Sequence, residues 1–270
     1  MNKKQMLYVL GMLFGMTFVS CSQGPDYEPT TQNGQGRLIL TLNANADFLK
    51  TRAVTEESYK NTSEYNVLLL DESGNVKLEC KGSELSTNTP MTLNNGTYIL
   101  KAYYGKEEKY SRNDFYVYGE KTLHIVAEDE ISETLTCSPT CGKISVNFDK
   151  DMAEYFTDYT VSFSGTKAMG TESIQWLKAD TEPWYVKLEP NGETITYTIQ
   201  ATAKDEYVSE DGKSTLVTTS TFSLARNKAF KLNVKPVYTP TGSGVLDIDI
   251  TIDETTNDKE INVEVPSTWL

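Results

Sequence analysis

Apolar and polar residues alternate along most of this 270-residue chain, in short segments separated by turn residues. In one segment Leu38, Leu40 and Leu42 occupy every second position, and in another Tyr98 and Leu100 do so. Because alternate residues of an extended strand point to opposite faces of a sheet, this pattern predicts strands with one buried face. The Gly, Asn and Asp residues between the segments are typical of turns. The sequence therefore predicts an all-β fold.

The predicted strands fall into two groups with a natural boundary near residue 138. The first group covers 37–43, 65–70, 76–78, 93–103, 115–118, 122–126 and 131–137. The second covers 143–148, 159–164, 172–177, 181–188, 195–203, 216–224, 229–237, 245–252 and 261–265, with one short helix at 151–156. Each group has the size of an ordinary sandwich domain. We predict two tandem antiparallel Greek-key β-sandwich domains of the immunoglobulin or transthyretin type, over 37–138 and 139–270.

The N-terminus has the features of a secretory signal. Lys3 and Lys4 precede an apolar stretch over 6–19, which is shorter than the roughly 20 residues of a membrane-spanning helix. A basic head, a short apolar core and a small residue before the break are typical of cleaved signals. We predict a lipoprotein signal peptide over residues 1–20, with Cys21 acylated as the first mature residue. The alternative is an ordinary signal in which Cys21 is incidental.

Residues 21–36 are polar and rich in Gly, Pro and Gln, which predicts a flexible tether between a lipid anchor and the first strand. Several acyl chains, palmitate among them, anchor a protein far more firmly than a single chain does. Ser22 after the cysteine favours passage to the outer membrane. We therefore expect a protein that is lipid-anchored in the cell outer membrane and exposed at the cell surface, with the membrane as one partner.

Acidic residues outnumber basic ones, 38 against 25, which gives a net charge of −13. Such a chain is repelled by nucleic acid, and no basic cluster interrupts the pattern, so we expect no nucleic-acid partner. The one histidine, His124, lies in an alternating segment, and no Gly-x-Ser-x-Gly motif is present. We predict no catalytic residue, no metal site and no cofactor, and hence a protein that is not an enzyme.

Cys80, Cys137 and Cys141 remain once Cys21 carries lipid. In an extended segment the α-carbons of Cys137 and Cys141 would be about 13 Å apart, which is beyond disulfide reach. A turn at Pro139 would close the gap in a compartment that permits disulfides. A Cys137–Cys141 bridge and two buried thiols therefore both remain open.

The tryptophans are the best candidates for contact with a ligand. Flat aromatic rings stack on sugars, and the run Pro183, Trp184, Tyr185 would suit a platform mounted on a loop. Tryptophan in a β-sandwich is more often a core residue, and Trp176 stands among apolar neighbours. Glycan contact by Trp184 or Trp176 is therefore one interpretation, and core packing is the other.

Three stretches carry a resemblance to a known family: the first strand 36–42 with the following 50–53, the hairpin entry 93–102, and the handover segment 137–146. With the lipid signal, they resemble a family of uncharacterised Bacteroidetes surface lipoproteins with two β-sandwich domains. That family is distantly similar to fimbrillin-type pilus subunits. Asp26 and Glu28 resemble the early acidic signals of surface-exported lipoproteins of that phylum. The resemblance implies an adhesion or pilus-accessory role with other surface or pilus subunits as partners.

The same resemblance gives Arg52 a role. In pilins assembled by strand exchange, a protease cuts after an arginine beyond the first strand, and another subunit's segment fills the groove. Arg52 follows the first predicted strand, so it is a candidate for such cleavage, whereas its loop position favours the alternative of an ordinary surface arginine. Residues 261–270 would be a donor strand or, as we favour, the closing strand of the second domain. The alternative function is a glycan-binding accessory lipoprotein of a polysaccharide uptake system.

Overall fold

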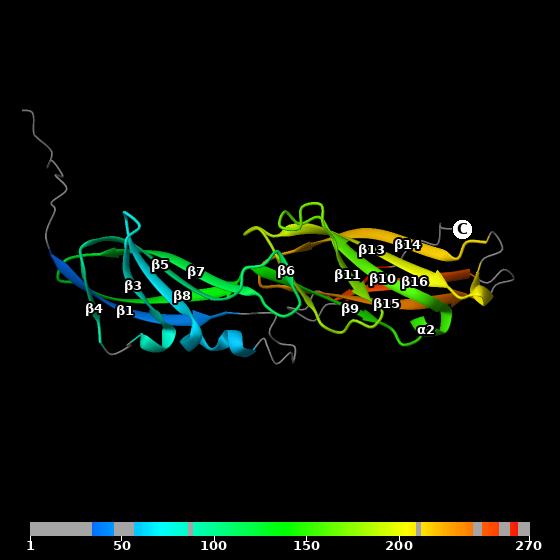
Figure 1. Cartoon of the computed structure of the whole chain (residues 1–270), viewed down its shortest axis with the longest axis horizontal. Coiled ribbons are helices and arrows are strands. Elements are labelled where there is room, and N and C mark those ends of the chain that lie inside the picture. Colours follow the sequence, from blue (N-terminus) through cyan, green and yellow to red (C-terminus); the bar gives the residue numbers. More distant parts are fainter. Residues whose placement is uncertain are drawn as a thin grey trace, which may run out of the picture. The chain divides into compact units, whose positions relative to one another are not determined.

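The computed structural model describes residues 34–45, 57–85, 89–208, 212–239, 245–253 and 260–263. They form a mostly β structure with three sheets, as the alternation predicts (Figure 1). The signal segment, most of the tether, Cys21 and Arg52 lie outside the described residues. Within the described ranges, no helix has the length and apolar character that crossing a membrane requires. The tandem Greek-key arrangement of two sandwiches stays a prediction.

The bounds of the elements follow the alternating segments closely. The strands are β1 (Gln35–Ala44), β2 (Asn66–Asp71), β3 (Val76–Lys81), β4 (Met91–Asn94), β5 (Gly96–Gly105), β6 (Tyr110–Ser111), β7 (Tyr116–Ile125), β8 (Glu130–Pro139), β9 (Cys141–Phe148), β10 (Phe156–Ser164), β11 (Ile174–Leu177), β12 (Trp184–Lys187), β13 (Glu193–Ala203), β14 (Thr215–Leu224), β15 (Ala229–Thr239), β16 (Val245–Asp253) and β17 (Glu260–Val263). The helical elements are α2 (Met152–Tyr155) and the 3-10 turns η2 (Ser58–Lys60), η3 (Thr62–Glu64), η4 (Gly82–Glu84) and η5 (Asp205–Tyr207).

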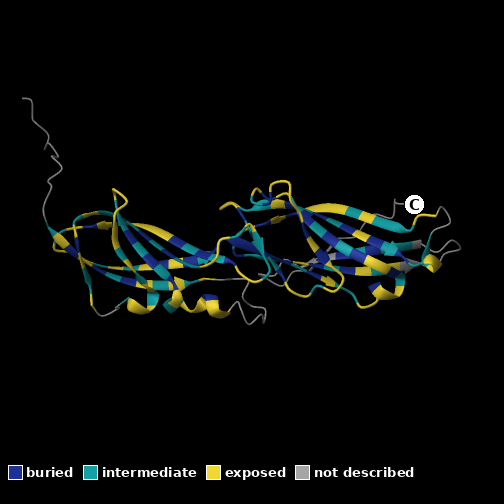
Figure 2. Ribbon diagram, viewed as in Figure 1, coloured by how far each residue is buried: buried dark blue, intermediate teal, exposed yellow. Residues whose placement is uncertain are grey.

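The first sheet has seven strands in the order β3-β2-β5-β7-β8-β1-β4. Its two halves join only where the start of β7 pairs with the end of β8, at Val117 with Pro139 and Tyr118 with Ser138. Alternate residues of both halves enter one core, which includes Leu40, Val67 and Leu135 (Figure 2). Because only these two residue pairs join the halves, the halves can fold toward each other and enclose one core between them.

Two further sheets enclose a second core. One has four strands in the order β11-β10-β13-β14, and the other has six in the order β17-β16-β15-β9-β12-β6. Val161 and Tyr197 enter this core from the four-stranded sheet, and Phe230 and Leu232 enter it from the six-stranded sheet. The ring centroids of Phe222 and Phe230 lie 3.4 Å apart, so the stacked pair joins the two sheets across the core.

Two strand pairs depart from the expected antiparallel arrangement. β1 runs parallel to β8 over eight residue pairs, from Arg37 with Glu130 to Ala44 with Cys137. β9 runs parallel to β15, from Lys143 with Ala229 to Phe148 with Val234. Alternation fixes which face of a strand is buried, but it carries no information about the direction of a neighbour that is distant in sequence.

The segments 115–118 and 122–126, predicted as two strands, belong largely to one strand, β7. Gly119 lies in the middle of it, and a Cβ there would be 2.8 Å from the Thr136 carbonyl oxygen and 2.9 Å from Cys137 Sγ. The glycine therefore permits close approach of two strands instead of marking a turn. At the other end of the chain, β17 pairs with β16, as expected for a closing strand.

Candidate functional site

The first strand, β1, is an internal strand of its sheet. It pairs with β8 on one side and with β4 on the other, so Leu38 lies opposite both Ile131 and Met91. The side chains of Leu38 and Leu40 are 1% and 3% exposed and belong to the first core. The described chain stops at residue 45 and resumes at 57, and the interval contains Arg52.

Removing β1 from this position would have two consequences. The backbone groups of β4 and β8 that bond to β1 would lose their partners, and the space that Leu38 and Leu40 fill would open. Together these changes would leave a groove shaped for an extended segment with alternating apolar side chains, which is the requirement for strand addition.

A second candidate lies where the connection between β5 and β7 meets the six-stranded sheet. There β6 pairs with β12, with Tyr110 opposite Val186 and Ser111 opposite Tyr185. Tyr185 is buried in the first core, 4.8 Å from the Phe115 ring, whereas its neighbour Val186 is buried in the second core. β12 therefore packs successive side chains into both cores.

Arg112 follows β6 directly and makes the densest set of contacts at this junction. Its Nη2 donates to Asp180 Oδ2 at 2.5 Å and to the Gln175 carbonyl at 3.2 Å, and its Nη1 donates to the Glu182 carbonyl. The guanidinium carbon lies 4.3 Å from the centre of the Trp184 ring. Arg112 is thus held by charge, by backbone acceptors and by an aromatic face together.

The structure brings the two predicted tryptophans together around Arg112. Trp176 is 1% exposed, its ring centre lies 5.1 Å from the guanidinium carbon, and its Nε1 has no hydrogen-bond partner among the described residues. Trp184 is half-buried, and its Nε1 donates to the Gln175 carbonyl at 3.1 Å. Arg112 therefore covers ring surface of Trp184 that a sugar would otherwise stack on. Arg112 itself was not predicted, because its partners lie 63 to 70 positions away in the sequence.

A cavity of about 450 Å³ lies beside this cluster. Tyr110, Arg112 and Trp184 line it together with Gln175 and Asp180. The Tyr110 hydroxyl donates to Glu172 at 3.1 Å, and Lys109 pairs with the same carboxylate at 3.2 Å. The hydrogen bonds from Lys109 and Tyr110 lower the pKa of Glu172, and the Glu172 contact raises the pKa of Tyr110. These contacts favour an ionised Glu172 and a protonated Tyr110.

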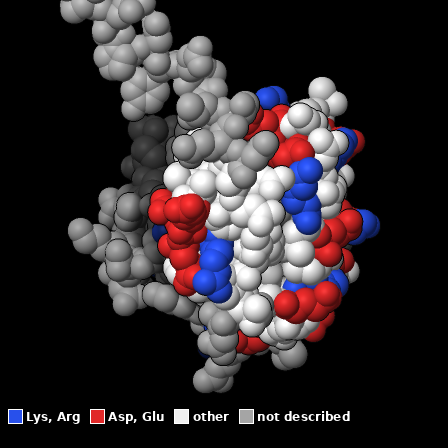
Figure 3. All heavy atoms as spheres, turned by 90° about the vertical axis from the view of Figure 1, so that its left-hand side faces the viewer, with Lys and Arg blue, Asp and Glu red and all other residues white. Residues whose placement is uncertain are grey.

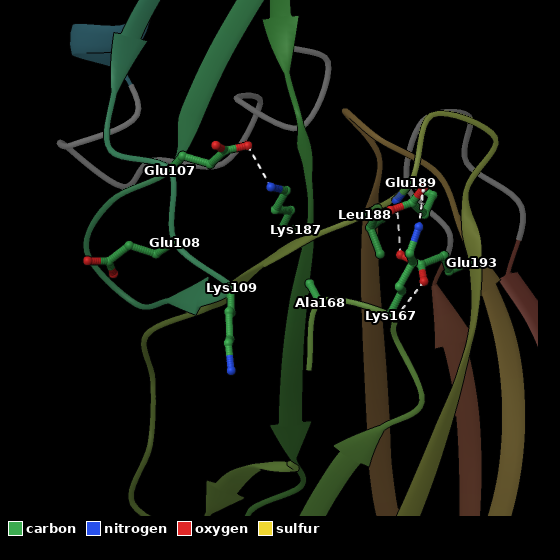
Figure 4. A pocket seen from close by; sticks show the side chains of 9 residues that line it. All are labelled: Glu107, Glu108, Lys109, Lys167, Ala168, Lys187, Leu188, Glu189 and Glu193. Carbon is green, nitrogen blue, oxygen red and sulfur yellow. Dashed lines mark hydrogen bonds and ion pairs between the residues drawn. The ribbon is translucent and has the colours of Figure 1, made fainter. Parts of the chain in front are cut away.

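A second cavity, of about 330 Å³, lies nearby and is lined by charged side chains (Figure 4). Lys187 pairs with Glu107 at 2.7 Å, and Lys167 pairs with Glu189 at 3.4 Å. The Glu193 carboxylate accepts from the backbone amides of Lys167 and Glu189 at 2.7 and 2.9 Å. Lys187 ends β12 and Glu193 begins β13, so these side chains hold loops around the cavity against the strand ends.

Cys137 and Cys141 are both buried thiols in the first core, on either side of a bend at Thr140 that follows the last residue of β8, Pro139. Cys137 Sγ lies 3.7 Å from the Ala102 carbonyl oxygen, and burial raises the pKa of this thiol to about 12. Cys80 is half-buried on β3. A bridge between Cys137 and Cys141 stays a prediction.

His124 is exposed on β7, with its Nδ1 3.2 Å from Thr97 Oγ1, as expected for a residue on the polar face. Across the described ranges, no three His, Cys, Asp or Glu side chains gather as metal ligands would. Figure 3 shows acidic and basic side chains interspersed on the face it presents, without a large basic patch among its described residues.

Comparison with solved structures finds distant likenesses of fold. A candidate adhesin from Bacteroides ovatus is 11% identical with a TM-score of 0.47, covering 84% of this chain and 96% of that one. The fimbrial anchor protein of Porphyromonas gingivalis is 12% identical with a TM-score of 0.42, covering 82% and 98%. A fimbrial assembly protein from Parabacteroides distasonis is 10% identical with a TM-score of 0.42, covering 85% and 98%.

No curated protein sequence matches the chain. A family profile does match it, over residues 34–267, and the description of that family is a domain of unknown function, DUF4493. The match begins at the residue before β1 and includes every element of the described structure. It confirms the recognition of a family of uncharacterised function. Since the profile covers most of its length, the chain belongs to the DUF4493 family.

Proposed function

We propose that this protein is a lipid-anchored, non-catalytic protein of the cell surface with an adhesion or pilus-accessory role. Its anchor would be the acylated Cys21, and its two sandwich domains, over 37–138 and 139–270, would project from the outer membrane on the tether. Its partners would be other surface or pilus subunits. The observation that supports this proposal best is the internal, core-filling position of β1 directly before the segment that contains Arg52.

Both Cys21 and β1 lie N-terminal to Arg52. A single cut after Arg52 would therefore remove the lipid anchor and, once β1 dissociates, open the groove between β4 and β8. The uncut chain would be an anchored subunit with a closed sheet. The cut chain would be a released subunit that accepts an extended segment from a neighbour.

This proposal is tested by cutting the mature chain with an arginine-specific protease and then adding a peptide with the sequence of residues 35–44. We expect the cut chain to lose thermal stability when β1 is washed away and to regain it with the peptide. A peptide carrying Leu38→Asp and Leu40→Asp is the matched control and should not restore stability. The variant Arg52→Ala should resist the cut. A chain that releases β1 yet binds neither peptide would contradict strand exchange.

A second candidate function, glycan binding, rests on the cavity beside Trp184 and its aromatic and amide lining. If a sugar stacks there, Trp184→Ala should abolish binding on a polysaccharide array, whereas Trp184→Phe should retain part of it. Because Arg112 occupies ring surface of Trp184, Arg112→Ala should strengthen or broaden binding. Absence of binding by the wild-type chain to every glycan would eliminate this function.

A further inference from the structure

β14 is the last strand of its sheet, and it is long and regular. It pairs with β13 in an unbroken register of ten residue pairs, from Thr215 with Thr202 to Leu224 with Glu193. Its other side has no strand partner among the described residues (Figure 1). The outward backbone groups of β14 therefore form a continuous row of donors and acceptors that a further strand would satisfy.

No residue of β14 carries a charge, and none is proline; its sequence is Thr-Leu-Val-Thr-Thr-Ser-Thr-Phe-Ser-Leu. The other described edge strands are protected in the usual ways. β3 carries Lys77, Glu79 and Lys81, and β4, β6, β11 and β17 have four residues or fewer. Within the described sheets, β14 is the one long edge that lacks any such protection.

The surface around this edge is exposed and uncharged. On the outer face of β14, Val217 is 50% exposed, and the hydroxyl-bearing residues at 219, 221 and 223 are exposed (Figure 2). On the same face of β13, the residues paired with them are Gln200, Thr198, Thr196 and Thr194. A charge-free face of two strands is unusual in a chain in which 23% of residues are charged.

We propose that β14 is a self-association edge, at which a second copy of this chain adds its own β14 in antiparallel orientation. Antiparallel pairing of a strand with itself is self-complementary, as a two-fold interface requires. The net charge of the chain also favours this edge as the place where a second copy binds. Two copies of a chain with net charge −13 repel each other, and an edge without carboxylates is where their approach is least opposed.

The geometry of the pairing follows from the alternation of side chains. Residues opposite each other in an antiparallel pair share a face of the sheet. When two copies of one strand pair, facing residues must therefore be an even number of positions apart in sequence, and one central residue faces its own counterpart across the two-fold axis. The central residues of β14 are Thr219 and Ser220. With Thr219 on the axis, Val217 faces Thr221 of the second copy. With Ser220 on the axis, Leu216 faces Leu224 on the inner side.

This edge lies in the four-stranded sheet and does not involve β1, so it is independent of strand exchange. Self-pairing at β14 is closed at two copies and needs no proteolysis. Strand exchange after Arg52 would instead continue from subunit to subunit. A dimer of the uncut chain and a ladder of the cut chain therefore report on the two proposals separately.

The first experiment measures the mass of the acylated mature chain in detergent by analytical ultracentrifugation over a range of concentrations. We expect a monomer–dimer equilibrium whose dissociation constant rises about tenfold in the double variant Val217→Lys, Thr221→Lys, because like charges then lie across the interface, directly opposite each other when Thr219 is on the axis. The matched control is Gln200→Lys, Thr196→Lys, which adds the same charge at the residues paired with these on β13. It should dimerise as the wild type does.

Cysteine cross-linking tests the register. Opposed α-carbons in an antiparallel pair are about 4.5–5.5 Å apart, within disulfide range. We expect Thr219→Cys or Ser220→Cys to form a dimer that reducing agent dissolves, and Thr198→Cys, one strand inward, to form none. A wild-type chain that stays monomeric at every concentration would overturn the proposal. A dimer that both double variants weaken equally, or that neither weakens, would also overturn it.

Discussion

At the scale of single residues, it is Arg112, and no motif in the sequence, that holds the loop after β6 in place at the junction with the six-stranded sheet. Its side chain is 22% exposed and joins the loop after β6 to Asp180 and to two backbone carbonyls. The two tryptophans that suggest a sugar platform in the sequence pack around this guanidinium instead. Apolar context indicated the burial of Trp176, but nothing in its neighbourhood could indicate an arginine far away along the chain.

We predict that Arg112→Ala lowers the free energy of unfolding by about 2–3 kcal/mol, because it removes the cationic partner of the half-buried Asp180 and one donor from each of two carbonyls. Arg112→Lys should recover little, since lysine cannot reproduce the planar fork. The control is Arg37→Ala, which removes an exposed pair with Glu130 and should cost less than about 1 kcal/mol. Urea unfolding followed by tryptophan fluorescence measures all three. Equal losses at Arg112 and Arg37 would contradict this role.

The buried thiol of Cys137 predicts a dependence of stability on alkaline pH. Burial raises its pKa to about 12 in the folded chain, whereas an exposed thiol titrates near 8.5. The unfolded state therefore loses this proton first, so the stability it contributes is complete below about pH 8.5 and is lost as pH rises toward 12. Under reducing conditions, Cys137→Ala should show a shallower decline in unfolding free energy between pH 9 and 10.5. Identical slopes would show that this thiol does not titrate as inferred.

At the scale of elements, alternation predicted nearly every strand, because burial of one face is a local property of the sequence. Strand partners and directions are not local, and for that reason the parallel neighbours of β1 and β9 were not predicted. The two-residue β6 is too short to show any periodicity, although it begins the junction. The break predicted between the segments 115–118 and 122–126 is absent, because Gly119 lies within β7.

The internal position of β1 predicts that its apolar face holds the first core together. Leu40→Ala should cost about 2–4 kcal/mol of unfolding free energy, since it removes buried methyl groups from a site 3% exposed. The neighbouring Thr41 points to the exposed face, so Thr41→Ala should change stability by less than about 0.5 kcal/mol. Chemical denaturation of the two variants provides the comparison. A small effect at Leu40 would mean that β1 contributes little to the core and that its removal opens no groove.

At the scale of the whole molecule, the order of features along the chain would connect the proposed attachment with the proposed assembly. The predicted lipid site, the tether and β1 precede Arg52, and all the remaining strands follow it. One proteolytic cut would thus release the protein from its lipid anchor and open its first sheet to an extended segment of another subunit. β12 packs into both cores and Arg112 joins the adjoining loops, so the strands after the cut retain a scaffold without β1.

The most direct test of the exchangeable first strand is the state of the protein in its native host. Surface material would be analysed by intact mass, N-terminal sequencing and gel electrophoresis without boiling, for the wild type and for Arg52→Ala. We expect wild-type ladders that resist detergent and whose subunits begin at Ala53. We expect the variant to remain a single species beginning at acylated Cys21. A wild-type protein that always begins at Cys21 and never forms a ladder would contradict strand exchange.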